Sequence, residues 1–248
     1  MTDGSRVRGI HAVTAVLRDD PARVRVVYCH SGRVDARIRG LLEDARAAGI
    51  RVERVDRRQL DRLAGPGHQG IAAHCNELAL ADELAFVDHL DTLDEPWLML
   101  ALDGITDPRN LGACLRSAEA AGVQGVLLPR RRSAPLNAAA LKAAAGAAEG
   151  LFLVEVANLA RRLEWLRDRG VWVVGAAGEA ETPWTEADLD GNCLVVVGSE
   201  GKGLRQLTAR CCDQLVSIPM AGAVSSLNVS VAAGVLLFEA VRQRRTRA

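Results

Sequence analysis

The chain has 248 residues, enough for one large or two modest domains that each bury a hydrophobic core. Acidic and basic residues balance at 31 each, so net charge by itself indicates no polyanionic partner. The six cysteines form no CxxC pair, which argues against a zinc site and a disulfide framework. The absence of a long uncharged apolar run and of a signal-like N-terminus predicts a cytoplasmic protein with no membrane span.

The first 77 residues alternate helical and strand patterns, as in a small α/β domain. The apolar spacing predicts helices over 9–18 and 35–48. Apolar and β-branched runs predict strands over 24–29, 51–55 and 70–74. This region holds 14 arginines against ten acids. The excess fits either a solvated surface or an RNA-facing patch, and charge alone leaves both interpretations open.

An acidic stretch separates this region from the rest of the chain. Residues 81–95 contain six acids and no lysine or arginine, and Pro96 follows them. Polar composition and proline are typical of domain boundaries. The sequence therefore predicts a linker or short connecting helix over 78–95, between an N-terminal domain at 1–77 and a larger domain at 96–248.

The larger domain repeats the alternation of strands and helices. Several of its predicted strands are continuous apolar runs, which are typical of a parallel sheet covered on both faces. The predicted strands cover 97–102, 125–128, 151–156, 171–176, 193–197 and 214–218. The predicted helices cover 111–121, 136–148, 159–169, 204–210 and 229–245. Ligands of such sheets bind at the carboxyl ends of the strands, where three motifs stand out.

The first motif is LDGITDPRNLGACLRSAEAAG. Asp107-Pro108 predicts a turn, and Asn110 is predicted as the N-cap of the next helix. Gly112 permits the close approach of another backbone. Arg116 lies about 240° around an ideal helix from Asn110, so the two share no face and Asn110 must act from the helix start or the loop. Taken alone, the motif also fits a simple cap and a surface cation.

The second motif, VVVGSEGKGL, is a strand followed by a glycine loop. It does not match the Walker pattern, because Gly203 follows Lys202, and it does not match GxGxxG. Glu200 in the middle of the loop would also repel a pyrophosphate. Both facts make a dinucleotide-dependent oxidoreductase a remote alternative. Taken alone, the loop also fits a tight turn in which Glu200 is incidental.

The third motif, SIPMAGAVSSLNVSVAAGVLLFEAVRQRR, is a small-residue loop that leads into a helix with apolar residues on most faces. A helix of that kind must be buried, either in a core or in a subunit interface. Ser225, Ser226 and Asn228 cluster at its start, and one of them is predicted to cap it.

Together and in this order, NLGACLR, VVVGSEGKG and IPMAGAVSSLNVSVAAG resemble the SPOUT class of RNA methyltransferases, specifically its SpoU/TrmH branch of ribose 2′-O-methyltransferases. GIHAV (9–13) and HQGIAA (68–73) resemble the substrate-binding domain of members that methylate a guanosine ribose in 23S rRNA. The resemblance covers the whole chain. It implies an α/β fold, in which a small N-terminal RNA-binding domain precedes a SPOUT domain with a mainly parallel sheet and a deep trefoil knot.

The resemblance also implies S-adenosylmethionine as methyl donor, a homodimeric assembly and chemistry that needs no metal. On the matching positions, the implied cofactor-binding residues are Gly198, Ile218, Leu227, Gly178, Met220 and Ala176. The implied catalytic residues are Arg116, Asn110, Glu200, Ser226 and Asn228.

The family assigns removal of the hydroxyl proton to the position of Arg116. A free arginine stays protonated far above neutral pH. We therefore expect Arg116 to clamp an RNA phosphate and to stabilise the developing oxyanion, while the other catalytic positions orient Arg116, the substrate or the donor. Glu200 suits a cation-bearing donor and equally suits a contact with Arg116. The basic triplet at 130–132 fits a solvated loop or a phosphate contact.

The predicted function is S-adenosylmethionine-dependent 2′-O-methylation of a guanosine ribose in 23S rRNA. The same chemistry on tRNA or another rRNA site is an alternative with a different substrate. A non-catalytic RNA-binding or ribosome-assembly factor is an alternative of another class. Its signature would be loss of Arg116 or Asn228, and both are present.

Overall fold

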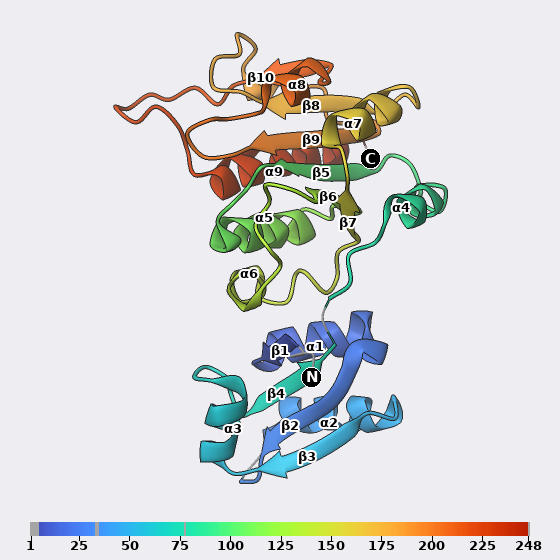
Figure 1. Ribbon diagram of the computed structural model, residues 1–248, viewed down its shortest axis with the longest axis vertical. Coiled ribbons are helices and arrows are strands. Elements are labelled where there is room, and N and C mark those ends of the chain that lie inside the picture. Colours follow the sequence, from blue (N-terminus) through green and yellow to red (C-terminus); the bar gives the residue numbers. More distant parts are fainter. Residues whose placement is uncertain (1–4, 33–34, 77, 248) are drawn as a thin grey trace.

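The computed structural model describes residues 5–32, 35–76 and 78–247, arranged around two separate sheets (Figure 1). The predicted domain boundary at Glu77 and the chain ends at 1–4 and 248 lie outside the described residues. The smaller sheet and its helices come from the N-terminal third of the chain, and the larger sheet comes from the rest. In the view of Figure 1 the two units are stacked along the long axis of the molecule.

The N-terminal sheet has four strands in the order β1-β4-β2-β3. Its strands are β1 (Ser5–Arg8), β2 (Val24–His30), β3 (Arg51–Val55) and β4 (Ile71–Cys75). Its helices are α1 (Ile10–Asp19), α2 (Ala36–Ala47) and α3 (Arg57–Ala64), with a 3-10 turn η1 (Pro21–Arg23). Strand β4 runs antiparallel to both of its neighbours, whereas β2 and β3 are parallel. The predicted α/β character and three of the predicted strands are confirmed.

Strand β1 and helix α3 were not predicted. Helix α3 presents only Leu60 and Ala64 to the core, too few apolar residues for a clear helical period. Its start carries a capping box, in which Asp56 accepts from the backbone of Gln59 and the Gln59 side chain accepts from the backbone of Asp56. That capping signal, rather than periodicity, identifies the helix.

The acidic stretch forms a connecting helix, α4 (Glu83–Leu90), that packs against the larger sheet. Phe86 of this helix is fully buried. Glu83 pairs with Arg162, and Ala81 forms an isolated bridge with Val154 of β7. The connection is therefore fixed to the C-terminal unit along this part of its length.

The C-terminal sheet has six strands in the order β10-β8-β9-β5-β6-β7, and every pair is parallel. Its strands are β5 (Leu98–Asp103), β6 (Gly125–Pro129), β7 (Leu153–Val156), β8 (Trp172–Ala176), β9 (Cys193–Gly198) and β10 (Gln214–Val216). The helices are α5 (Pro108–Ala120), α6 (Ala138–Ala144), α7 (Leu159–Arg167), α8 (Gln206–Arg210) and α9 (Val229–Arg247), with a 3-10 turn η2 (Trp184–Glu186). Helices α5, α6 and α9 bury their apolar sides in one core, and α4 and α7 bury theirs in a second core. The predicted parallel sheet covered on both faces is confirmed.

Helix α5 begins earlier than predicted. Its N-cap is Asp107, whose Oδ1 accepts from the Arg109 backbone N–H at 2.9 Å, and Pro108 occupies the first turn. The prediction of Asn110 as the N-cap was wrong, because a proline has a helix-compatible φ and lacks the N–H that the first helical position leaves unpaired. Asn110 instead lies inside the first turn, where it is buried and its side chain makes a tertiary contact.

Helices α5 and α6 touch through their backbones. A Cβ on Gly112 would lie 2.1 Å from the Ala140 carbonyl oxygen, so no larger residue fits there. This confirms the predicted close approach at Gly112 and fixes α6 against the helix that carries Asn110 and Arg116. None of the helices in the described part of the chain has the length and apolar character needed to cross a membrane.

Candidate functional site

The carboxyl ends of the parallel strands bring the three motifs to one edge of the larger sheet. Asp103 at the end of β5 is registered with Gly198 at the end of β9. Ala176 at the end of β8 is registered with Val216 at the end of β10. Residues that are far apart in the sequence therefore meet at this edge, as expected for an open parallel sheet.

A chain of side-chain hydrogen bonds links the three motifs directly. The Asn228 amide Nδ2 donates to Asn110 Oδ1 at 3.0 Å and to Glu200 Oε1 at 2.5 Å. Asn228 Oδ1 accepts from the backbone and the hydroxyl of Ser230, at 2.9 and 2.6 Å. Asn228 is thus the predicted cap of α9, and its amide also connects one residue from each of the other two motifs.

The glycine loop after β9 folds back on itself. Ser199 and Gly203 exchange two backbone hydrogen bonds, at 3.0 and 2.9 Å. Gly201 and Gly203 have φ of 76° and 62°, values that glycine adopts without strain. A Cβ on Gly198 would lie 2.1 Å from the Gly203 carbonyl carbon. The bare Cα of Gly198 is therefore required first by the loop's own backbone, and the fold presents Glu200 at its tip.

A cavity of about 500 Å³ lies between this loop, the end of β8 and the loop before α9; we call it the cofactor cavity. All six predicted cofactor positions line it, namely Gly198, Ile218, Leu227, Gly178, Met220 and Ala176. Glu200 and Ser226 line it as well. The six positions come from three separate segments of the chain, and the tertiary structure gathers them around one space.

A second cavity of about 830 Å³ lies on the other side of the glycine loop; we call it the acceptor cavity. The two cavities share the wall formed by Ser199, Glu200, Lys202, Gly203 and Val229. Asn110 lines the acceptor cavity together with three cations, Arg132, Lys202 and Arg205. The hydrogen-bonded chain of Asn110, Asn228 and Glu200 therefore lies beside a cationic space and a second space whose charged lining residues are Glu179, Glu200 and Lys202.

Sequence reasoning missed Asp103 and Arg205, which shape the acceptor cavity. Asp103 is buried, and its Oδ2 accepts from the Arg205 backbone N–H at 2.8 Å. Its Oδ1 lies 3.4 Å from Arg205 Nε and has no hydrogen-bond partner among the described residues. The signal was present, because an aspartate directly after a buried apolar strand of a parallel sheet lies at the ligand-binding edge.

Two arginines of the basic triplet at 130–132 have different surroundings. Arg130 Nε donates to Glu155 at 2.6 Å, which directs it to the surface of β7. Arg132 lines the acceptor cavity and has a φ of 60°, a conformation uncommon for a residue with a side chain. Backbone strain of this kind concentrates at functional sites. Of the two interpretations of the triplet, the phosphate contact suits Arg132.

Arg116 lies apart from these side chains. It is exposed on α5 and lines neither cavity, and within the described residues it has no hydrogen bond or ion pair. Glu200 contacts Asn228, not Arg116. A single copy of the chain thus gathers four of the five predicted catalytic residues and leaves the fifth on the surface.

The cysteine next to this site is not a nucleophile. All six cysteines are free, and five of them are buried. Burial, with a smaller contribution from the Glu200 carboxylate, raises the pKa of Cys114 to about 12. Cys114 is therefore a neutral thiol at physiological pH and packs as a small apolar side chain, as the sequence predicted for these residues.

Comparison with protein families assigns both parts of the chain. Residues 97–238 match the model described as the SpoU rRNA Methylase family. Residues 6–81 match the model described as RNA 2′-O ribose methyltransferase substrate binding. The chain belongs to the SpoU rRNA methylase family. The resemblance drawn from the three motifs and from the two N-terminal segments is confirmed.

Curated relatives of this SpoU methylase align along nearly their whole length. The chain is 51% identical over 244 residues to the 23S rRNA (guanosine-2′-O-)-methyltransferase RlmB of Pseudomonas aeruginosa, covering 98% of each chain. It is 50% identical over 248 residues to the protein of that name from Ralstonia nicotianae, again covering 98% of each chain. The expected class of enzyme, an RNA 2′-O-methyltransferase, is confirmed.

Solved structures of the family share the fold of this SpoU methylase. AviRb, a SpoU methyltransferase from Streptomyces viridochromogenes, was solved in complex with the cofactor AdoMet. It is 25% identical, and the match has a TM-score of 0.80 over 98% of this chain and 92% of that chain. The similarity covers the N-terminal sheet as well as the methylase sheet.

Proposed function

We propose that this chain transfers a methyl group from S-adenosylmethionine to the 2′-hydroxyl of a guanosine ribose in 23S rRNA. The observation that carries the proposal is the chain of Asn110, Asn228 and Glu200, which lies between two adjacent cavities of different chemistry. The identity to enzymes named for this reaction supports the choice of substrate, and rRNA as the substrate supports a cytoplasmic location.

The cofactor cavity suits S-adenosylmethionine in size and chemistry. Its volume of about 500 Å³ lies within the range of small-molecule sites. Apolar side chains that include Val197, Val216 and Met220 offer a surface for the adenine, and Glu179 and Glu200 offer carboxylates to a ligand with a sulfonium and an ammonium. When bound, this cofactor supplies an activated methyl group, so the protein needs to position the acceptor rather than to activate the donor.

The acceptor cavity suits the target nucleotide of an RNA. The guanidinium of Arg205 is held against Asp103, and a Cβ on Gly104 would lie 3.0 Å from Arg205 Nη2. Gly104 thus leaves room for the guanidinium beside the strand end. The Arg205 guanidinium, together with Arg132 and Lys202, provides positive charge for the phosphates on either side of the ribose. The ribose hydroxyl, the group that distinguishes RNA from DNA, then faces the shared wall.

Glu200 in the shared wall, together with the side chains that hold it, orients the acceptor. Asn228 is fixed at both ends, by Ser230 on one side and by Asn110 and Glu200 on the other. Glu200, which lines both cavities, offers its second carboxylate oxygen as an acceptor for the ribose hydroxyl, and the bonds from Asn228 keep that carboxylate in position. Stabilisation of the developing oxyanion falls to a cation. Ser226, on the cofactor side of the wall, completes the polar lining.

We propose that Arg116 acts in a homodimer, at the site of the partner subunit. Arg116 is exposed on α5, and α9 packs directly on that helix. Helix α9 exposes Val231 and Phe238, each 51% exposed, seven residues apart on the same side. A second copy of the chain that covers this apolar side brings Arg116 close to the partner's site. There the permanently charged guanidinium of Arg116 clamps an RNA phosphate.

The proposal assigns RNA binding to residues 1–77, the connection to 78–95 and methyl transfer to 96–248. It includes a deep trefoil knot in the last segment. The position of α9 supports the knot, because this helix follows the loop at 217–228 and then returns to pack on α5 and β9 in the middle of the sheet. The knot would hold the cofactor loops in place without a disulfide.

Labelled S-adenosylmethionine and a 23S rRNA transcript test the proposal. We expect label at one guanosine ribose, mapped by resistance of the modified position to alkaline cleavage. A tRNA transcript in the same assay tests whether tRNA is the substrate instead of 23S rRNA. Cofactor binding without label on any ribose would overturn the assignment and favour the non-catalytic RNA-binding factor.

Subunit mixing tests the placement of Arg116. An Arg116→Ala chain and an Asn228→Ala chain are each expected to be inactive alone. If Arg116 serves the partner's site, mixed dimers contain one complete site and recover activity, up to about a quarter of the wild-type value for random pairing. No recovery despite confirmed subunit exchange would place Arg116 in its own subunit's site.

A further inference from the structure

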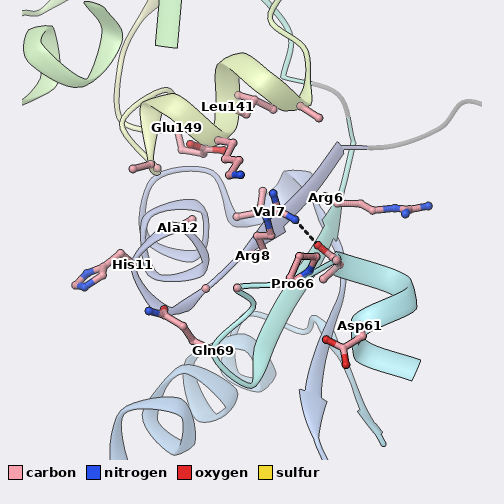
Figure 2. A pocket seen from close by; sticks show the side chains of 18 of the residues that line it. Arg6, Val7, Arg8, His11, Ala12, Asp61, Pro66, Gln69, Leu141 and Glu149 are labelled. Atoms are coloured by element: carbon pink, nitrogen blue, oxygen red, sulfur yellow. Dashed lines mark hydrogen bonds between the residues drawn. The ribbon is translucent and has the colours of Figure 1, made fainter. Parts of the chain in front are cut away.

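A third cavity, of about 570 Å³, lies between the N-terminal sheet and helix α6; we call it the interdomain cavity (Figure 2). The N-terminal unit contributes β1, the start of α1 and the loop at 65–69, and the methylase unit contributes α6 and the turn after it. Figure 2 shows Leu141 and Glu149 on one side of this space and Arg8 and Gln69 on the other. The predicted catalytic residues do not line it.

The lining of the interdomain cavity is cationic. Its basic side chains are Arg6, Arg8, His11, Arg62 and Lys142, and its carboxylates are Asp61 and Glu149. Both carboxylates are already engaged, Asp61 with His68 Nε2 at 3.1 Å and Glu149 with Arg23 at 3.3 Å. The space therefore presents net positive charge to a ligand, although the chain as a whole is neutral.

The N-terminal wall of the cavity is held in a strained conformation. Gln69 has a φ of 53°, and its Oε1 accepts from the Ile10 backbone N–H at 2.9 Å. Arg8 Nη1 donates to the Ala64 carbonyl oxygen at 2.8 Å, which directs the guanidinium along the cavity wall (Figure 2). These contacts join the GIHAV and HQGIAA segments, which the catalytic machinery does not use. Strain that persists in this way is typical of ligand sites.

Close contacts between the two units fix the shape of the cavity. A Cβ on Gly146 would lie 3.1 Å from the Cα of Ala12, and a Cβ on Gly150 would lie 3.2 Å from Asp19 Oδ2. Beside these contacts, Arg23 and Glu149 form an ion pair with side chains 5% and 3% exposed. A buried pair requires its partner to stay in place, because separation would leave a charge without compensation. These contacts hold the two units against each other and so define the shape of the cavity.

Helix α6 connects this cavity to the catalytic site. One side of α6 meets α5 at Gly112, two residues from Asn110. Another side presents Ala138, Leu141 and Lys142 to the interdomain cavity. Arg132, which lines the acceptor cavity, lies six residues before α6 begins. An RNA strand that leaves the acceptor cavity along this path meets cations from both units.

We propose that the interdomain cavity binds the sugar-phosphate backbone of the RNA segment next to the target nucleotide, with Arg8, Arg62 and Lys142 as the phosphate contacts. The inference rests on the proposed function and adds to it a site made jointly by the two units. The N-terminal unit then does not bind RNA alone. Its position against α6 sets the distance between the held phosphates and the reacting ribose.

Alanine substitutions on the two walls test this site. Arg62 and Lys142 are exposed, so Arg62→Ala and Lys142→Ala remove charge without disturbing a core. Arg58→Ala is the matched control, because Arg58 is an exposed arginine one turn earlier on α3 that does not line the cavity. Affinity for a labelled 23S rRNA transcript is measured over a range of salt concentrations, with thermal unfolding as a check on folding.

Each cavity substitution is expected to weaken RNA binding by about 3- to 10-fold and to reduce the slope of log affinity against log salt by roughly 0.7 to 0.9. The affinity for S-adenosylmethionine stays unchanged. Arg58→Ala changes none of these values. Equal RNA affinities for all three variants, or an equal loss in the control, would overturn the site. Failure of the unsubstituted chain to methylate RNA would instead count against the proposed function, and the affinity comparison would still decide whether the cavity binds RNA.

Discussion

Two glycine-rich loops, one in each unit of the molecule, are both closed by hydrogen bonds but border cavities of different charge. The loop at 199–203 follows β9 and closes through paired hydrogen bonds between Ser199 and Gly203. The loop at 65–70 precedes β4 and is closed by the bond between Gln69 and the Ile10 backbone. Both contain residues with positive φ, and both line a cavity.

The difference lies in what the loops present. The methylase loop places Glu200 against an amide and an otherwise weakly charged cavity, whereas the N-terminal loop borders a space lined by cations. Rigid glycine loops are thus not phosphate sites by default. Their backbone supplies precision, and the neighbouring side chains decide whether a cation or a phosphate is bound.

Substitution of Asn228 is expected to give the largest effect on the methylase loop. Asn228→Ala removes the amide that joins Asn110 to Glu200 and lowers kcat about 10²- to 10³-fold, and it also removes the α9 cap at a cost of about 1 kcal/mol. Asn228→Asp keeps the capping oxygen and replaces the donor. It should lose activity while the thermal midpoint stays near that of wild type. Retained activity in Asn228→Asp would show that the cap alone matters.

Substitution of Gly198 tests whether the methylase loop depends on its own backbone contact. Gly198→Ala places a methyl group where the Gly203 backbone lies, and we expect cofactor affinity to fall at least tenfold with a stability loss of about 1–3 kcal/mol. Gly191→Ala, just before the start of the same strand, meets nothing within 4 Å and serves as the control. Calorimetric titration with S-adenosylmethionine measures the difference. Equal affinities would contradict the role of the bare Cα.

Substitution of Gln69 is the corresponding test of the N-terminal loop. Gln69→Ala removes the acceptor for the Ile10 N–H, a loss of about 1 kcal/mol that raises the KM for RNA about fivefold while kcat stays constant. Gln69→Gly also lacks the acceptor but relieves the positive φ, so it should lose less stability than Gln69→Ala. Steady-state kinetics with varied RNA give the KM. A fall in kcat instead would place this loop in the catalytic step.

The smallest effect is a difference in pH dependence between two buried glutamates. Burial raises the pKa of Glu149, between the units, above 4.5, whereas the hydrogen bond from Arg242 lowers the pKa of Glu239, inside the methylase unit, below 4.5. Relative to Glu149→Gln, wild-type stability should fall as pH rises from 4.5 through the raised pKa. Relative to Glu239→Gln, it should fall as pH drops from 4.5 through the lowered pKa. Denaturant titrations of the three proteins at several pH values measure both trends, and the same trend for both glutamates would contradict the assigned environments.

The elements that the sequence predicted well are those whose burial is periodic. Strand β9 is a fully buried apolar run, and α7 buries the regularly spaced Leu159, Leu163 and Leu166. Helix α3 lacks a clear apolar period because it buries only two residues, and the sequence places the start of α5 too late because Asn110 resembles a local cap. In both cases a short-range cue, the capping box or the proline, was more informative than periodicity.

The candidate site was partly predictable for the same physical reason. The motifs identified Glu200, Asn110 and Asn228, because each lies in an unusual local pattern of glycine, asparagine and serine. The sequence signals Asp103 only by its place after an apolar strand, and it does not single out Arg205, since one arginine is not distinctive in a chain with 31 basic residues. Their pairing requires the register of β5 with β9, which only long-range contacts create.

The sequence by itself determined the α/β class, the parallel sheet and the family, because apolar periodicity and short motifs are local properties of the chain. Only the tertiary structure decided that Asn228 is both a helix cap and the bridge between Asn110 and Glu200. It also decided that Lys142 lines one cavity with Arg8 and Arg62 of the other unit, while Arg116 stays on the surface. The reason is that a local pattern fixes which face a residue occupies, whereas the packing of distant elements fixes which other residues that face will meet.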